Sequence, residues 1–97
     1  MISTRLRIAD DHPALPGHFP GRPVVPGVVV LDRVAAAIER EYRVRIVALP
    51  QVKFASPLLP EQDAELRVEE KAGRLHFNVL RDGVPVASGI AETETAA

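Results

Sequence analysis

Residues 16–32 read PGHFPGRPVVPGVVVLD, in which a loop dense in proline and glycine runs directly into an apolar segment. Proline removes backbone donors and glycine weakens regular structure, so we expect neither a helix nor a paired strand before Gly27. The loop holds few of the polar residues that are typical of disorder, and its prolines restrict the path of the chain. The segment therefore predicts a shaped loop that leads into a helix.

The helix is expected to run from Val28 to about Glu41, a stretch that contains no helix breaker and is largely apolar up to Ile38. A helix that is apolar on nearly every side is buried rather than laid on a surface. Its valines are tolerable where packing, and not helix propensity, decides the structure. We therefore predict one long central helix that is covered on several sides.

The rest of the chain predicts β-strands. A short strand is expected around Leu6 and Ile8, which alternate with arginines. Four more strands should follow the helix, because apolar and polar residues alternate there between turn signals such as Asp82-Gly83. We place them at about residues 45–54, 64–69, 75–79 and 84–91, with a frayed tail at 92–97.

A curved antiparallel sheet wrapped around the helix would provide the cover that a buried helix needs. The element order is a strand, a loop, a helix and a meander of four antiparallel strands. It predicts an α+β fold with one long central helix, and we treat residues 1–97 as a single domain.

The composition limits the class of protein. The chain has 97 residues, 46% of them apolar, and a chain this small gains from association with a second copy. Cysteine is absent, which excludes thiol nucleophiles, disulfides and thiolate metal sites. The chain begins unlike a signal peptide, and no apolar run reaches the roughly 18 residues of a membrane span. We therefore expect a cytoplasmic protein that does not act in a membrane.

The net charge of −1 gives no reason to expect a nucleic-acid partner. The charge is unevenly distributed, because residues 1–54 carry eight Lys or Arg against five Asp or Glu, and residues 55–97 carry four against eight. This asymmetry would suit an acidic partner that docks on the first half, although an ordinary solvated surface gives such an asymmetry more often.

Three residues of the loop and helix are candidates for chemistry. His18 lies in the shaped loop. Gly27 stands at the start of the helix, where backbone N–H groups lack an intrahelical acceptor and a ligand can approach closely. Asp32 lies a little over one turn inside the helix among apolar neighbours, and a carboxyl group buried in such surroundings can stay protonated and act as an acid near neutral pH.

Each of these features also has a structural explanation. Proline and glycine at the junction would equally end a loop and begin a helix. A carboxylate near a helix start gains from the helix dipole without any catalytic role. The other histidines, His12 and His76, are expected to be solvated, and no spacing of residues predicts a metal site or a phosphate-binding loop.

Residues 16–32 closely resemble the signature of the 3-hydroxyacyl-[acyl carrier protein] dehydratases. That signature reads Gly-His-Phe-Pro-Gly, a variable residue, Pro, two apolar residues, Pro-Gly and an acid five residues further on. The resemblance implies a hotdog fold, with His18 as the catalytic histidine, Asp32 as the catalytic acid and the Gly27 N–H bound to the thioester carbonyl. Phe19 and Val28 are expected to contact the substrate as well.

The resemblance also implies the reaction and the partners. The chain would dehydrate a 3-hydroxyacyl thioester to the trans-2-enoyl thioester without a metal or redox cofactor, and the substrate would arrive on the phosphopantetheine arm of acyl carrier protein. In the family, the histidine and the acid of one site come from different subunits. We therefore expect a homodimer or higher even oligomer, or a heterodimer with a related hotdog subunit.

The chain is shorter than the usual enzymes of fatty acid synthesis, and in this it resembles the small dehydratase-like proteins of aryl polyene or pigment pathways. Two alternative functions stay open. A hotdog acyl thioesterase also uses an acid near the central helix, but it has no need of His18 in the loop. A non-catalytic acyl-thioester-binding subunit of a heteromeric dehydratase is the other, and the pair of His18 and Asp32 argues against it.

Overall fold

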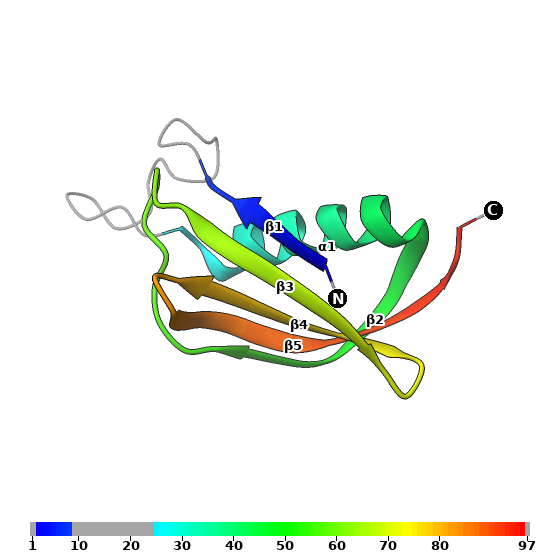
Figure 1. The fold of residues 1–97 in the computed structure, drawn as a ribbon. Helices are drawn as coiled ribbons and strands as arrows, with labels where there is room; N and C mark the ends of the chain where they lie inside the picture. The colour runs from blue at the N-terminus through cyan, green and yellow to red at the C-terminus, as the bar shows by residue number, and fades with distance from the viewer. Residues whose placement is uncertain (1, 9–24, 97) are drawn as a thin grey trace.

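The computed structural model describes residues 2–8 and 25–96, and one helix packs there against one face of a five-stranded antiparallel sheet (Figure 1). The strand order across the sheet is β1-β3-β4-β5-β2. The predicted α+β arrangement of a curved sheet and one long helix is confirmed. The elements are β1 (Ile2–Leu6), α1 (Gly27–Tyr42), β2 (Val44–Phe54), β3 (Ala64–Lys71), β4 (Arg74–Arg81) and β5 (Val84–Thr95).

The predicted meander is right for three strands and wrong for the fourth. Strands β3, β4 and β5 pair in succession, whereas β2 pairs with β5 at the far edge of the sheet. The connection of nine residues between β2 and β3 is too long and too rich in proline for a tight hairpin. They cross the end of the sheet, where the Ala55 N–H donates to the Val86 carbonyl at 2.9 Å and the Val25 N–H donates to the Leu58 carbonyl at 2.8 Å.

Two tight turns connect the paired strands of the meander. Ala72 and Gly73 have φ angles of 52° and 77°, and Asp82 and Gly83 have φ angles of 50° and 78°. Positive φ at both central residues is what a type I′ turn requires, and this turn matches the right-handed twist of the strands. The hairpin predicted at Asp82-Gly83 is therefore confirmed.

Strand β5 is longer than its apolar pattern predicts. It continues to Thr95, and Thr93 and Thr95 pair with Ile46 and Val44 of β2. The expected frayed tail is wrong for residues 92–95, because the long β2 supplies backbone partners that the local sequence does not reveal. Ion pairs join the two glutamates of this extension to neighbouring strands, Glu92 to Arg74 and Glu94 to Arg45.

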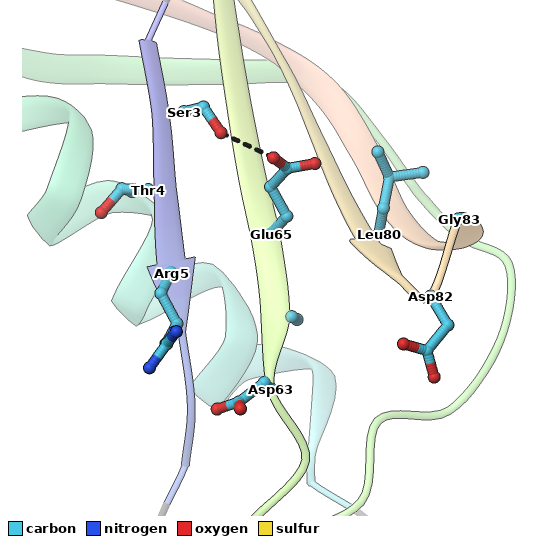
Figure 2. Close-up of a pocket in the computed structure, with 9 residues that line it drawn as sticks. Ser3, Thr4, Arg5, Asp63, Glu65, Leu80, Asp82 and Gly83 are labelled. Carbon is cyan, nitrogen blue, oxygen red and sulfur yellow. Dashed lines mark hydrogen bonds between the residues drawn. The ribbon is translucent and has the colours of Figure 1, made fainter.

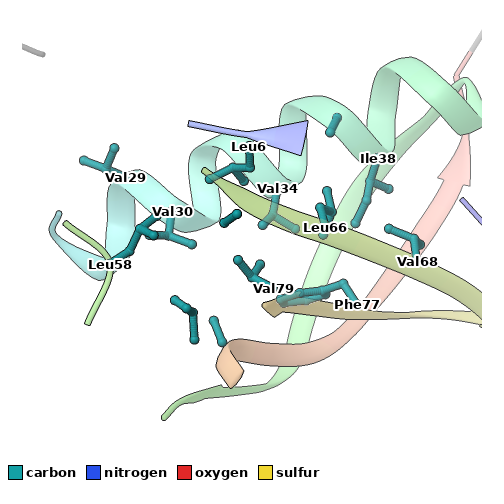
Figure 3. Close-up of a cluster of buried hydrophobic side chains, with 14 of the residues drawn as sticks. Leu6, Val29, Val30, Val34, Ile38, Leu58, Leu66, Val68, Phe77 and Val79 are labelled. Atoms are coloured by element: carbon teal, nitrogen blue, oxygen red, sulfur yellow. The ribbon is translucent and has the colours of Figure 1, made fainter. Parts of the chain in front are cut away.

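The core lies between α1 and the inner face of the sheet (Figure 3). In β3 and β4 every second side chain points inward, so Leu66 and Val68 meet Phe77 and Val79 across the strand pair. Each buried side chain of this size stabilises the fold by about 1.5–3 kcal/mol relative to exposure. The largest fully buried side chains are Phe77, Ile8, Ile38, Leu58, Leu66, Val34, Val68, Val79 and Val86.

The helix is not covered on all sides, which corrects the prediction of a fully buried helix. Val30, Val34 and Ile38 are buried toward the sheet, whereas Val28 is 64% exposed and Asp32 is exposed. One five-stranded sheet can cover only one side of a helix, so the opposite face of α1 lies open in the single chain. No helix of the described residues is long and apolar enough to cross a membrane.

Candidate active site at the start of the central helix

The start of α1 presents backbone N–H groups that have no hydrogen-bond acceptor among the described residues. Pro26 precedes the helix, and its carbonyl accepts hydrogen bonds from the N–H groups of Val29, at 2.9 Å, and Val30, at 3.3 Å. Within residues 2–8 and 25–96, no acceptor contacts the N–H groups of Gly27 and Val28, and no side chain caps the helix. Two such donors at the positive end of a helix dipole can stabilise negative charge on an oxygen atom.

A groove of about 440 Å³ opens beside these donors. Its walls come from the start of α1, the end of β2 and the connection between β2 and β3. Most of the lining is apolar, which suits the hydrocarbon part of an acyl thioester better than a charged substrate. The lining residues are Val25, Gly27, Val30, Phe54, Ala55, Ser56, Pro57, Leu58 and Val86.

Phe54 lies directly over Gly27, and this close approach explains the glycine. A Cβ atom at position 27 would lie 2.7 Å from Cζ and 2.9 Å from Cε1 of the Phe54 ring, which is closer than real Cβ contacts. The ring is 52% exposed, so it borders the groove rather than the core. Phe54 is a candidate site residue that the sequence interpretation missed. The signal that points to it is an aromatic residue at the end of a strand, three positions before Pro57.

Asp32 lies on the open face of α1, one turn beyond Val28 on the same side of the helix. The expectation that Asp32 is buried is wrong for the single chain. Its apolar neighbours in sequence point toward the sheet or to the flanks, because successive helical residues are separated by about 100° around the axis. An acid held in dry surroundings at this position would therefore need cover from another molecule.

Of the five predicted site residues, the structure describes three. Gly27, Val28 and Asp32 come together on the first two turns of α1. His18 and Phe19 lie outside the described residues, so their roles stay predictions, as does the solvated state of His12. His76 projects from the outer side of β4, away from the helix, and is half-buried. In the part of the chain that the structure describes, no group of three or more His, Asp or Glu could hold a metal ion.

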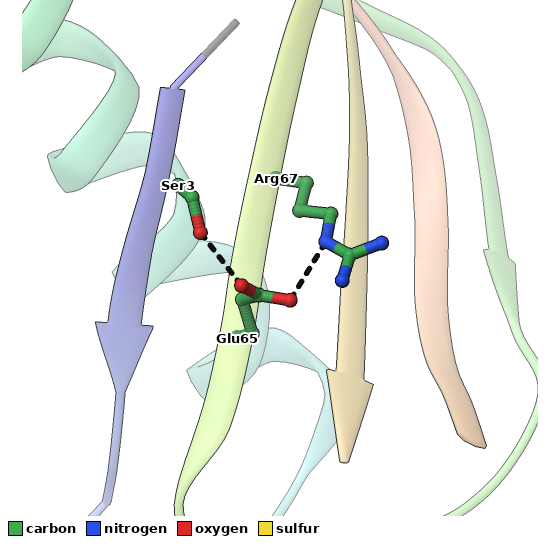
Figure 4. Close-up of polar contacts among 3 residues, drawn as sticks. All are labelled: Ser3, Glu65 and Arg67. Atoms are coloured by element: carbon green, nitrogen blue, oxygen red, sulfur yellow. Dashed lines mark hydrogen bonds and ion pairs between the residues drawn. The ribbon is translucent and has the colours of Figure 1, made fainter. Parts of the chain in front are cut away.

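A second hollow, of about 420 Å³, lies on the outer side of the sheet where β1, β3 and the β4–β5 turn meet (Figure 2). It is bordered by Arg5, Asp63 and Asp82, and it lacks the free helix start. Beside it, Glu65 accepts hydrogen bonds of 2.7 Å from the Ser3 hydroxyl and from Nε of Arg67 (Figure 4). The bond from Ser3, with a smaller contribution from Arg67, lowers the pKa of the Glu65 carboxyl below its usual value.

Comparison with solved structures identifies the fold. The chain superposes on a subunit of the dehydratase heterocomplex ApeI:P from Xenorhabdus doucetiae with a TM-score of 0.79 and 25% identity, over 94% of this chain and 84% of that one. An uncharacterised protein from Erwinia carotovora subsp. atroseptica gives a TM-score of 0.74 at 24% identity, over 96% and 82% of the two chains, which is evidence for the fold alone. Both support the hotdog fold.

Curated relatives are 3-hydroxyacyl-[acyl-carrier-protein] dehydratases named FabZ. The protein from Roseobacter denitrificans is 30% identical over 95 residues, which cover 87% of this chain and 59% of the relative. The protein from Herpetosiphon aurantiacus is 32% identical over 93 residues, which cover 81% and 66%. The chain therefore spans about three fifths to two thirds of the length of these relatives.

The sequence also matches a family model. The model is that of the ApeI-like family, described as ApeI dehydratase, and the match extends over residues 1–90. The signature segment, the helix and four of the strands lie wholly within it. The chain belongs to the ApeI-like dehydratase family and has the hotdog fold of that family.

Proposed function

We propose that this chain removes water from a 3-hydroxyacyl thioester, carried by acyl carrier protein, to give the trans-2-enoyl thioester. The observation that carries this proposal is the pair of N–H groups at the start of α1 that have no acceptor among the described residues. They open onto an apolar groove, with Asp32 about one turn away. The names of the FabZ relatives supply the reaction and the carrier. A pathway of fatty acid, polyene or related lipid synthesis is consistent with both sets of relatives.

The reaction follows from the groups at the helix start. The thioester carbonyl oxygen accepts a hydrogen bond from the Gly27 N–H, so negative charge can develop there. His18 removes the proton from C2, which the thioester makes acidic. The electron pair then forms the C2–C3 double bond as the C3–O bond breaks, and Asp32 gives a proton to the departing hydroxyl. The products are water and the enoyl thioester, and the reaction consumes no redox equivalent.

The exposure of Asp32 supports a site that is completed by a second subunit. Val28 on α1 and the exposed Val47 and Leu49 on β2 provide apolar surface beside the open face of the helix and along the open edge of the sheet. A second hotdog chain on this surface would exclude water from Asp32. We therefore infer that His18 and Asp32 of one site come from opposite chains, and that Phe19 and Val28 line the substrate path between them.

A direct assay tests the proposed reaction. The purified protein is incubated with a 3-hydroxybutyryl group on acyl carrier protein, and formation of the enoyl product is followed by mass spectrometry. The substitutions His18→Ala and Asp32→Asn should each lower kcat/KM by about 10²–10⁴-fold, because each removes one proton transfer. Activity that survives both substitutions would contradict the mechanism. Release of free carrier thiol instead of enoyl product would identify a thioesterase.

A second candidate function is an acyl-thioester-binding subunit that works only beside a related chain. The exposed Asp32 and the heterocomplex in which the ApeI neighbour was solved favour this candidate. It predicts that the purified chain binds the carrier-linked substrate without dehydrating it. Dehydration by the chain alone would exclude this candidate.

A further inference from the structure

A third groove, of about 340 Å³, runs between β1 and the flank of α1. Its floor is apolar and consists of Leu6, Leu66 and Ala37. Its rim carries Arg5 from the strand and Arg33 and Arg40 from the helix. Among residues 2–8 and 25–96, no carboxylate lines the groove, so its described rim is positively charged and its floor is apolar.

Arg33 and Arg40, the two helix arginines of the rim, differ from Arg67 and Arg74 on the outer side of the sheet in how they are paired, whereas Arg5 borders both this groove and the outer hollow. On the outer side, Arg67 contacts Glu65 at 2.7 Å and Arg74 contacts Glu92 at 2.8 Å. In the described ranges, no carboxylate lies within ion-pair distance of Arg5 or Arg33, and Arg33 donates only to the Arg7 carbonyl, at 3.3 Å. Within the described part of the chain, the positive charge of Arg33 is therefore not neutralised by an ion pair and can attract an anionic partner.

Among the described residues, Arg40 is the rim arginine that forms an ion pair. Its Nε lies 3.5 Å from a carboxylate oxygen of Glu41, and both side chains are solvent-exposed. An exposed pair of this kind is weak, so it does not prevent the guanidinium from binding another anion. A guanidinium can bind a carboxylate or a phosphate through two parallel hydrogen bonds.

The groove is connected to the start of α1 by the open face of the helix. Val28, Asp32 and Ala36 follow one another at intervals of four residues, so they form one exposed strip, and Ala36 also lines the groove. Arg33 lies about 9 Å from Gly27 along the helix axis, given a rise of 1.5 Å per residue. A flexible arm that is anchored at the groove can therefore reach the free N–H groups.

The groove also stays accessible when two chains associate. It lies at the β1 edge of the sheet, whereas β2 forms the opposite edge. A second copy that covers the apolar residues of β2 would leave the arginines of the rim in contact with solvent.

We propose that this groove is the surface on which the acidic face of acyl carrier protein docks, and this inference rests on the proposed function. Carboxylates of the carrier, and the phosphate at the base of its arm, meet Arg5, Arg33 and Arg40. The pantetheine arm then follows the strip of Val28, Asp32 and Ala36 to the helix start. Charge complementarity of this kind mainly raises the rate of encounter.

The test compares two double variants that remove the same charge. One is Arg33→Gln with Arg40→Gln, in the groove, and the control is Arg67→Gln with Arg74→Gln, on the outer side of the sheet. Each is assayed with a 3-hydroxybutyryl group on acyl carrier protein and with the uncharged N-acetylcysteamine thioester of the same acid. Circular dichroism and thermal melting establish that both variants fold.

The groove variant should lose about tenfold or more in kcat/KM for the carrier-linked substrate. It should keep the wild-type value, within about twofold, for the N-acetylcysteamine thioester, and the control variant should match wild type on both. The difference should shrink in 0.5 M salt, where exposed charges are screened. Equal losses on the two substrates, or equal losses in the two variants, would overturn the docking surface.

If the proposed function is wrong, the dehydration assay gives a different result. If wild type dehydrates neither thioester, binding of fluorescently labelled carrier protein becomes the measurement. Binding that is about tenfold weaker for the groove variant than for wild type and the control supports the docking surface. Equal binding by all three proteins overturns it.

Discussion

The close contact between Gly27 and the ring of Phe54 restricts which residue can occupy position 27. The glycine has room for no side chain, since a Cβ atom would lie 2.7 Å from the ring. The ring is half exposed and can move, so a clash here would be relieved by displacement of Phe54 rather than by unfolding. Gly27 is therefore required by the shape of the groove more than by the stability of the fold.

The substitution Gly27→Ala separates these two requirements. Alanine is favoured over glycine in helices by about 1 kcal/mol, so the melting temperature should stay level or rise. Because the ring must shift across the groove, kcat/KM for dehydration should fall by up to about 10²-fold. Adding Phe54→Ala, with Phe54→Ala alone as the control, should recover part of the loss. An unchanged kcat/KM in Gly27→Ala would show that the contact has no role in the reaction.

Asp32 shows the limit of arguments from neighbouring residues. The sequence around it is apolar, and burial was the natural expectation. The described structure places Asp32 on the open face because the helix has only one sheet to cover it. Whether such a residue is shielded from water depends on contacts between chains, and the sequence of a single chain does not show these contacts directly.

Among the elements, the hairpin turns follow their local sequence most closely. The Asp82-Gly83 turn could be predicted because few residue pairs adopt positive φ at both positions. The Ala72-Gly73 turn adopts the same φ signs with an alanine at the first position. A left-handed conformation costs an alanine roughly 1 kcal/mol or more, so this turn holds strain that another residue could relieve.

The substitution Ala72→Asn should therefore stabilise the protein by about 0.5–1 kcal/mol, since asparagine tolerates the left-handed region. For a domain of this size, this corresponds to a rise in Tm of about 2–8 °C. The same change at Ala36, on the exposed face of α1, should lower Tm because asparagine is a poorer helix former. Calorimetry on both variants would contradict the strain argument if Tm fell in both.

Strand β2 shows which part of the fold could not be read from local pattern. Its alternation identified a strand at nearly the right position, but the sequence contained no signal that it pairs with β5 instead of β3. Pairing between strands about 40 residues apart depends on the whole sheet and on the route of the connection. The extension of β5 to Thr95 was missed for the same reason.

At the scale of the whole molecule, the sheet ends in two unlike edges. The β1 edge is bordered by arginines, whereas β2 exposes apolar side chains, with Val47 54% and Leu49 39% exposed. Apolar residues on an open edge strand favour association. The apolar edge is therefore the surface that we propose a second hotdog chain covers.

Val47→Lys tests this assignment, and Val84→Lys is its matched control. Val84 is 45% exposed but lies beside the β4–β5 turn, away from the open edge of β2. A lysine buried without a partner in the interface should cost about 3 kcal/mol or more, which raises the dimer Kd by at least about 100-fold. Sedimentation velocity should detect monomer in Val47→Lys and dimer in Val84→Lys. A wild-type protein that is monomeric at micromolar concentration would contradict the proposed dimer.

The crossing of β2 to the far edge of the sheet also bears on the order in which the protein folds. The two hairpins from β3 to β5 join residues that are close in sequence, so their loops close at low entropic cost. The groove requires Gly27, Phe54 and Val86 together, and these residues meet only after β2 has paired with β5. A partly folded chain that holds only the three-stranded meander therefore lacks this groove. The chain can therefore bind a molecule in this groove only once β2 has paired with β5, which is the step that completes the sheet.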